Sequence, residues 1–298
     1  MSVAVPPANA DVAVEAPVER ERFQSLRRLL RQPAAAVALT VLALLVLLVV
    51  LAPLVGRYDP TEVAPRDQLQ GPSAMHWFGT DELGRDLYSR IVWGGRLALG
   101  IAVAATAIAM LLGTLWGGIA AMRGGLVDEI LMRIVDGIMS IPIILTALIL
   151  VAAFGASVTS LALILGLLHV PVTARMVRSA ILVERHTEYC VAATAAGASW
   201  WRLLRREILP NTTPTLLVQA SLNAASIILT EAALSFVGLG IQPPDATWGT
   251  LLQQGYAKIY TAYWFVIFPG LFIFITIWAL NVLADQLQVV LDPREAHR

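Results

Sequence analysis

Five long stretches without a charged residue constrain the fold of this chain more than any other feature of its sequence. They cover residues 32–56, 97–122, 137–174, 208–230 and 259–284. A hydrocarbon core about 30 Å thick requires roughly 20 helical residues, so four of the stretches fit single membrane spans. The third stretch is long enough for two spans with a turn at FGASVTS. We therefore predict six transmembrane helices, at 34–56, 97–122, 134–156, 158–174, 213–238 and 263–285.

The class of fold follows from the character of these stretches. They are continuous and do not alternate between apolar and polar residues, as strands of a membrane barrel would. Helices also satisfy their own backbone hydrogen bonds in lipid. With 57% hydrophobic and 14% charged residues, the composition is that of a membrane protein. The prediction is an all-α polytopic membrane bundle.

The segments between the spans divide the rest of the chain. Residues 1–19 are predicted to be a disordered tail, and residues 20–33, with the sequence RERFQSLRRLLRQP, a basic amphipathic helix on the membrane. The first span is expected to remain as an anchor and not to be cleaved as a signal peptide. The remaining segments are 57–95, 175–211, 239–262 and the tail at 286–298.

The distribution of basic residues predicts the orientation. If the N-terminus is cytoplasmic, the cytoplasmic segments hold 15 of the 21 Lys and Arg residues. By the positive-inside rule, both termini and the segment 175–211 are then cytoplasmic, whereas 57–95 and 239–262 are extracytoplasmic. The basic residues lie next to the spans, so nucleic-acid binding is not indicated.

The stretch EYCVAATAAGASWWRLLRREILPN, residues 188–211, resembles two short soluble helices around a glycine. Thr187 and Ser199 are expected to cap the helices, and Gly197 to end the first. The second is expected to stop at Pro210, and Thr213 and Pro214 to begin the fifth span. An apolar face at helical spacing is predicted to dock a cytoplasmic partner, or alternatively to pack on the chain's own bundle. This face and its continuation comprise Tyr189, Ala192, Ala193, Ala196, Gly197, Trp200, Leu203, Leu204, Ile208 and Pro210.

Polar residues recur along one side of the fifth predicted span. At 100° per residue they lie within about 80° of one another. Such a stripe either lines a water-filled substrate path or forms hydrogen bonds between helices, since unsatisfied amides in hydrocarbon are costly. The stripe consists of Thr215, Gln219, Asn223, Ser226 and Thr230.

Three other features within the spans are interpreted structurally. Glu231, an acid deep within a span, is a functional candidate by position, but it lies outside the stripe and is expected to pair with a neighbouring helix. A proton-relay role is the alternative. His169 is interpreted as a packing residue at a span end, and Gly113 and Gly117 as sites of close helix approach.

Three segments together resemble a known family. The first is the Ala192–Ala193, Gly197 and Ile208–Leu209–Pro210 skeleton, which is similar to the EAA loop of ABC-importer permeases, with Val191 in place of the glutamate. The others are HWFGTDELGRDLYSRIVWGGRLAL at 76–99 and EAALSFVGLGIQPPDATWG at 231–249. They resemble the C-type subunit of the dipeptide, oligopeptide and nickel permease group, and the similarity extends over about 76–285.

This resemblance implies a type I ABC-importer permease with a core at 97–285. It implies a second homologous permease, two ABC ATPase subunits that bind ATP and Mg, and an extracytoplasmic solute-binding protein. Transport would proceed by alternating access, with di- or oligopeptides as cargo and nickel or another small solute as the alternative. The outer segments are expected either to form an ordinary interfacial helix or to receive the binding protein. Their candidate residues are Thr80, Asp81, Arg85, Asp86, Pro243, Pro244, Asp245 and Trp248.

The sequence lacks the motifs of an enzyme. It has no G-x-x-x-x-G-K-[ST] phosphate-binding loop, and its single lysine, Lys258, is predicted to lie outside the cell. The four histidines are dispersed, so no metal site is predicted, and no catalytic motif is present. Two other classes remain as competitors. An ion-coupled carrier would require more intramembrane acids or broken helices, and a non-transporting scaffold would not require the polar stripe.

Overall fold

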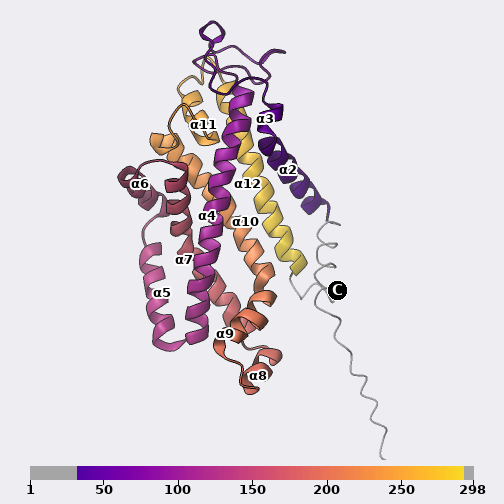
Figure 1. Cartoon of the computed structure of the whole chain (residues 1–298), viewed down its shortest axis with the longest axis vertical. Coiled ribbons are helices and arrows are strands. Elements are labelled where there is room, and N and C mark those ends of the chain that lie inside the picture. The colour runs from indigo at the N-terminus through magenta and orange to yellow at the C-terminus, as the bar shows by residue number, and fades with distance from the viewer. Residues whose placement is uncertain (1–31, 292–298) are drawn as a thin grey trace, which may run out of the picture.

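The computed structural model describes residues 32–291, and this part of the chain is built of helices (Figure 1). Three short segments, η1 (Pro65–Asp67), η2 (Leu204–Ile208) and η3 (Ser235–Leu239), are a 3₁₀ turn and two π turns. The α-helices are α2 (Pro33–Val50), α3 (Ala52–Val55), α4 (Leu87–Arg123), α5 (Gly125–Met139), α6 (Ile143–Phe154), α7 (Val158–Glu184), α8 (Glu188–Ala195), α9 (Trp200–Leu203), α10 (Leu209–Leu234), α11 (Trp248–Tyr256) and α12 (Trp264–Leu291).

The predicted all-helical membrane fold is confirmed. Among the described residues, five helices are long and apolar enough to cross a bilayer, and a bent pair makes a sixth candidate span. The two ends of the bundle differ (Figure 1): α11 and the segment after α3 lie at one end, and α8 and α9 at the other. We refer to these as the α11 end and the α8 end. The predicted tail at 1–19 and nearly all of the helix predicted at 20–33 lie outside the described residues.

Several helices extend beyond the predicted spans. The helix predicted at 97–122 begins at Leu87, where Asp86 accepts a hydrogen bond from the Ser89 N–H at 2.8 Å. The resulting α4 is about 55 Å long, which exceeds the hydrocarbon thickness. Similarly, α7 continues from the predicted end at 174 to Glu184, and α12 continues into the predicted tail as far as Leu291. Hydropathy marks the part of a helix in lipid, whereas caps and packing determine where the helix ends.

The span predicted at 134–156 is the bent pair. Helices α5 and α6 meet at an angle of 80° across Ser140–Pro142. Pro142 explains the break, because proline disfavours helical geometry at the preceding residue and cannot donate a backbone hydrogen bond. The first of the two helices also carries charged residues, and Asp136 and Asp128 pair with Arg175 and Arg178 of α7.

The fifth span does not begin at Thr213, and the second short helix does not stop at Pro210. Helical structure instead runs from Trp200 through both positions, and the backbone leaves the helical conformation only at Gly238, which has a φ of +93°. The π turn η2 directly precedes Pro210, and a wider turn accommodates a ring that clashes with the preceding turn of an α-helix. The hydroxyls of Thr212 and Thr213 donate to the Ile208 and Leu209 carbonyls, at 3.1 and 3.0 Å.

The centre of the bundle is the packing of α4 against α7. Gly113 and Gly117 lie where the two helices approach, as expected from the sequence. A Cβ atom added at Gly117 would lie 2.3 Å from the Ala174 carbonyl oxygen, which belongs to the backbone and cannot move aside. Close approach of the two helices therefore requires glycine at this position.

We expect Gly117→Leu to lower the thermal unfolding midpoint, because overpacking against backbone costs about 1–3 kcal/mol or more. The matched control is Gly100→Leu on the same helix, where an added Cβ meets nothing within 4 Å. Thermal unfolding of the purified chain in detergent measures both variants. An equal effect of the two substitutions would contradict the assignment of Gly117 to the α4–α7 contact.

Candidate functional site

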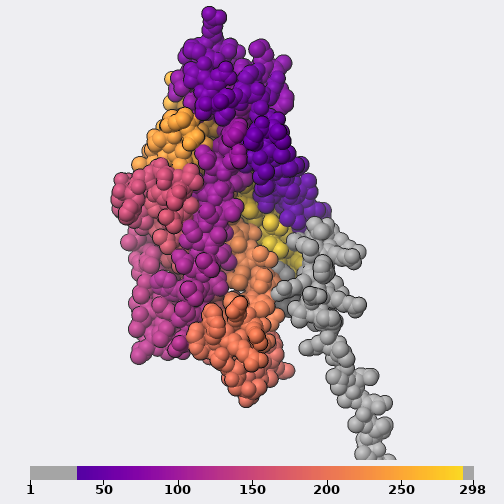
Figure 2. Space-filling view, in the orientation of Figure 1, coloured from indigo at the N-terminus to yellow at the C-terminus, as the bar shows by residue number. Residues whose placement is uncertain are grey.

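The segment between α7 and α10 forms a compact lobe at the α8 end (Figure 2, orange). Helix α8 ends in a Schellman motif, in which Gly197 and Ala198 donate backbone hydrogen bonds to Thr194 and Ala193, both at 3.0 Å. Gly197 has a φ of +84°, which a side chain would strain. Ser199 then caps α9 by accepting from the Arg202 N–H at 3.4 Å. Thr187, in contrast, donates its hydroxyl to the Glu184 carbonyl and does not cap α8 with its side chain.

The inner side of this lobe is packed against the bundle. Leu203, Leu204 and Ile208 are buried in a cluster with Cys190 and the α7 residues Val177 and Ile181. These three residues were predicted to dock a partner, but they anchor the lobe to the chain itself. Ala193 is also turned toward this cluster and is half-buried.

Two aromatic residues of the predicted docking face are engaged within the chain. Tyr189 donates a hydrogen bond to the Glu184 carboxylate and accepts one from the Asn211 amide at 2.9 Å. Partial burial, together with the bond to Glu184, raises the pKa of Tyr189 to about 12, so the phenol remains a donor. The ring of Trp200 lies under the Arg123 guanidinium, 4.8 Å from its centroid. These contacts join the lobe to α7, α10 and α4.

The outer side of the lobe presents small apolar side chains. Val191, Ala192 and Ala195 are exposed on α8, Ala196 is exposed at its C-cap, and Trp201 is exposed on α9. We call these five residues the coupling surface. Beside them a cavity of about 570 Å³ is lined by residues that include Met122, His186 and Trp200. The predicted docking face is therefore divided: Ala192, Ala196 and Gly197 are accessible, whereas its larger aliphatic residues are not.

The polar stripe of α10 is part of a hydrogen-bonded network inside the bundle. Gln219 donates to Asn223 at 2.8 Å, and Asn223 donates to Thr173 of α7 at 2.8 Å. The Asn223 amide also approaches the Met110 sulfur of α4 at 3.7 Å. These bonds match the alternative in which the stripe connects helices.

The same stripe also lines a cavity of about 450 Å³ at the α5–α6 bend. Gln219, Asn223 and Ser226 line it together with Met139 and Pro142. Thr215 and Thr230 do not line this cavity: Thr215 is exposed nearer the α8 end, and Thr230 is buried and donates to the Ser226 carbonyl at 2.8 Å. The stripe therefore combines helix contacts with a polar surface that faces an open space.

His169 contributes to this surface and is not at a span end. It lies inside α7, with Nδ1 2.8 Å from the Leu165 carbonyl oxygen and Nε2 3.1 Å from the Ser226 hydroxyl. A carbonyl can only accept, so the proton is on Nδ1, and in the neutral ring Nε2 accepts from Ser226. This contact was not predicted from the sequence, since α7 and α10 are far apart in the chain.

Glu231 is fully enclosed and bonded to a neighbouring element. Its Oε1 accepts hydrogen bonds from the hydroxyls of Ser235 and Thr247, both at 2.8 Å. Thr247 is the N-cap of α11 and forms a capping box with Thr250. The carboxyl group therefore connects α10 with the start of α11.

We expect Glu231→Gln to retain, within about threefold, the transport that the family resemblance implies, because an amide oxygen still accepts both hydroxyl donors. Glu231→Leu should instead lower the unfolding midpoint, because both hydroxyls lose their acceptor. Uptake into proteoliposomes and thermal unfolding test the pair. A folded Glu231→Gln variant with no transport would favour the proton-relay role.

At the α11 end, the residues predicted to receive a partner are mostly buried. Asp81 forms ion pairs with Arg85, at 2.6 Å, and with Arg90. Asp86 caps α4 and binds His76 Nδ1 at 2.9 Å. The interfacial helix considered for this segment is absent at Thr80, whose hydroxyl donates to the Asp67 carbonyl and accepts from the Gln70 N–H.

The second predicted outer segment has one buried residue and one exposed group. Trp248 is buried, and its indole N–H donates to the Ile91 carbonyl at 2.9 Å. Pro243, Pro244 and Asp245 are exposed. Only this last group of the predicted outer residues is accessible to a partner.

A helical membrane bundle with a polar cavity between its helices and an exposed apolar surface on a lobe packed against one end has the architecture of a transporter subunit. The chain belongs to the family of binding-protein-dependent transport system inner membrane components, whose model matches residues 109–297. Residues 23–72 match the N-terminal transmembrane domain of oligopeptide transport permease C. The predicted family is confirmed. The chain is a multi-pass inner-membrane permease component and not itself an enzyme.

The similarity to known proteins extends over nearly the whole chain. The dipeptide transport system permease protein DppC of Bacillus subtilis is 37% identical to this chain. The alignment covers 90% of this chain and 84% of DppC. A putative peptide transport system permease of Brucella suis is 40% identical and covers 90% of each chain. The oligopeptide transport system permease OppC of Bacillus subtilis is 36% identical, covering 87% of this chain and 85% of its own.

A solved structure supports the fold. The MetNI methionine ABC transporter in inward-facing conformations contains a chain that aligns with a TM-score of 0.56 at 20% identity. The alignment covers 67% of this chain and 96% of the other. The type I importer permease fold expected from the sequence is therefore confirmed.

Proposed function

We propose that this chain is one of two permease subunits of an ATP-driven importer for di- and oligopeptides. The relatives named above carry peptide transport in their names, at 36–40% identity over about nine tenths of the chain. A second, homologous permease completes the translocation path. Both termini and the α8 end lie in the cytoplasm, as the distribution of basic residues indicates, and the α11 end faces outward.

The coupling surface is the observation that carries the mechanism. Exposed alanines permit close approach of another protein, and the buried side of the same lobe is fixed to α4, α7 and α10. A partner that moves this lobe therefore moves the bundle with it. Two ABC ATPase subunits, which bind ATP and Mg, are the proposed partners. They drive alternating access only if they contact the coupling surface differently in their two states.

The polar cavity at the α5–α6 bend is the proposed part of the cargo path. Amide and hydroxyl groups of Gln219, Asn223 and Ser226 suit the peptide bonds of a passing substrate. The bend places irregular backbone beside this cavity, which is tolerated at membrane depth where the backbone lines a cavity or is buried in protein.

Reconstitution tests this function directly. The purified complex of this chain, its sister permease and two ATPases is placed in proteoliposomes with the solute-binding protein. We expect uptake of a labelled dipeptide that requires ATP and is reduced by unlabelled di- or tripeptides but not by Ni²⁺. Uptake by the chain alone, driven by an ion gradient, would contradict the proposal.

A further inference from the structure

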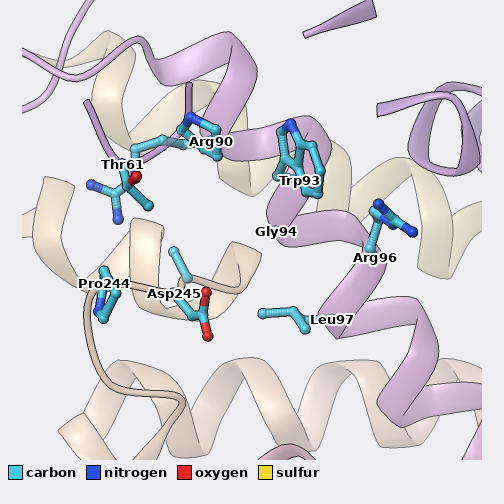
Figure 3. Close-up of a pocket in the computed structure, with 10 residues that line it drawn as sticks. Thr61, Arg90, Trp93, Gly94, Arg96, Leu97, Pro244 and Asp245 are labelled. Carbon is cyan, nitrogen blue, oxygen red and sulfur yellow. The ribbon is translucent and has the colours of Figure 1, made fainter. Parts of the chain in front are cut away.

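Two cavities within the described part of the chain differ in the charge of their walls. The pocket of about 340 Å³ at the α11 end is lined by the guanidinium groups of Arg90 and Arg96 and the carboxylate of Asp245 (Figure 3). The cavity of about 450 Å³ at the α5–α6 bend is lined by residues that carry no charge when His169 is neutral. The direction of the hydrogen bonds in this second wall therefore decides which charged group it can accept.

The backbone carbonyl of His169 fixes the orientation of two amide side chains in this wall. A carbonyl only accepts, so the Thr173 hydroxyl, 2.9 Å away, donates its hydrogen there. Thr173 then accepts from Asn223 Nδ2 at 2.8 Å, which turns Asn223 Oδ1 toward Gln219. This oxygen accepts from Gln219 Nε2 at 2.8 Å. Gln219 Oε1 is therefore the acceptor at the end of the series of bonds.

Gln219 Oε1 is accessible from the cavity. Gln219 lines the cavity and is 9% exposed. In the described part of the chain, the side-chain atoms that are both fully buried and unpaired belong to Arg90, Thr106, Trp116 and Gln254, and not to Gln219. An amide oxygen that accepts no hydrogen bond from the protein and retains accessible surface is a site for a donor of the cargo.

Ser226 is oriented in the same way by a second carbonyl. The Leu165 carbonyl places the His169 proton on Nδ1, so Nε2 accepts the hydroxyl hydrogen of Ser226 at 3.1 Å. His169 is 3% exposed and has no carboxylate among its hydrogen-bond partners in the described residues, so its ring is neutral. Ser226 is exposed and lines the cavity. With its hydrogen committed to His169, its Oγ offers only lone pairs to the cavity.

Few donors remain in this wall. Asn223 has one further N–H, which approaches the Met110 sulfur at 3.7 Å, and Gln219 has one further N–H. The Thr146 hydroxyl, which also lines the cavity, can donate or accept. The fixed polar groups are thus mainly acceptors. An ammonium group only donates and a carboxylate only accepts, so the wall suits the first and repels the second.

We infer that Ser226 Oγ and Gln219 Oε1 are two successive binding sites for the N-terminal ammonium group of the cargo peptide, an inference that rests on the proposed function. Residues seven positions apart are separated by about 10 Å along a helix, so the ammonium meets one site after the other. Uncharged oxygen atoms at several sites bind a cation weakly enough to release it, as conduction requires. The carboxylate of the peptide lies away from this wall.

The first experiment locates the amino end of the peptide by photolabelling. Photoleucine-glycine and glycine-photoleucine have the same free termini but carry the diazirine next to the ammonium or next to the carboxylate. The complete complex in proteoliposomes, with its solute-binding protein, is illuminated during ATP-driven uptake, and labels on α10 are located by mass spectrometry. Relative to uptake, we expect about threefold or more label on 219–226 from photoleucine-glycine, because its ammonium bonds to this wall. Equal labelling, or more from glycine-photoleucine, would overturn the inference.

The second experiment introduces opposite charges at one position of the cavity. Ser226→Lys places an ammonium where the cargo ammonium is expected, so uptake of a labelled dipeptide should fall about tenfold or more. Ser226→Asp retains acceptor oxygens and should keep uptake within about threefold. Each variant adds one charge at the same site, so a merely structural effect would lower both. Equal loss in the two, or normal uptake by Ser226→Lys, would contradict the ammonium sites.

The two proposals fail in different ways. If the wild-type complex takes up neither photoleucine dipeptide with ATP, the proposed function is wrong, and the ammonium sites fail with it. If the complex takes up both dipeptides and 219–226 is labelled equally by them, the peptide-import function stands and only the ammonium sites are wrong.

Discussion

Ala192→Arg should disconnect the permease from its ATPases while leaving the bundle folded. Ala192 is exposed at the centre of the coupling surface and makes no side-chain contact that holds the lobe together. A long, charged side chain there prevents close approach of a partner and leaves a cation to be desolvated. Disruption of an interface hot spot costs about 2 kcal/mol or more, which corresponds to roughly 30-fold weaker binding.

The measurement combines co-purification of the ATPase subunits with ATP-dependent peptide uptake, both of which should fall at least tenfold. Tyr260→Arg is the control, because Tyr260 is fully exposed at the α11 end and the same residue is introduced there. It should retain the ATPases. Normal uptake by a correctly inserted Ala192→Arg variant would show that the coupling surface is not the ATPase contact.

The neighbouring substitution separates docking from folding. Ala193 is turned toward the buried cluster around Cys190, so Ala193→Arg disturbs the packing of the lobe as well as any docking. A lowered unfolding midpoint is therefore expected for Ala193→Arg and not for Ala192→Arg. Comparison of the two variants thus distinguishes the inner side of α8, which packs on the bundle, from its exposed outer side.

Asp81→Ala should strongly destabilise the α11 end of the protein. The carboxylate is fully buried, and its Oδ1 also accepts the backbone N–H groups of Leu83 and Arg85, at 2.8 and 3.0 Å. Its removal leaves Arg85 and Arg90 buried without a counter-charge. Removal of one partner of a buried ion pair costs about 3–5 kcal/mol. The loss should appear as a large decrease in the thermal unfolding midpoint.

Glu82→Ala is the matched control for this substitution. Glu82 is adjacent in sequence and acidic, but it is exposed and approaches Lys258 only at 4.0 Å. Exposed ion pairs contribute about 0–1 kcal/mol, so the midpoint should hardly change. If Asp81→Ala were as mild as Glu82→Ala, Asp81 would not hold the two arginines in place.

The sequence predicted best those features that depend on local composition. A run of about 20 apolar residues identifies a membrane span by itself, because each helix satisfies its own backbone. Gly197 as a helix end and Gly117 as a packing site also follow from the side chain that each residue lacks. The helix ends were less predictable: the Asp86 cap that begins α4 and the π turn before Pro210 depend on neighbouring structure.

The sequence predicted which residues of the candidate sites share a helix face, but it did not predict which of their side chains are exposed. Helical periodicity showed which residues of 188–211 share a face, yet it did not show that Leu203, Leu204 and Ile208 face the chain's own α7. The family resemblance likewise predicted an outer-face contact that includes Asp81, Arg85 and Asp86. Asp81, Arg85 and Asp86 are instead buried in ion pairs and caps. Charge in a loop sequence does not distinguish a solvated group from a paired one.

What the sequence alone determined is the membrane bundle, its number of candidate spans and its family, because these follow from runs of apolar residues and from local motifs. Only the tertiary structure decided which side chains remain accessible. The contacts of His169 with Ser226, Glu231 with Thr247, and Arg90 with Asp81 connect separate elements. Such contacts depend on how helices pack, and packing is a property of several segments at once and not of any one of them.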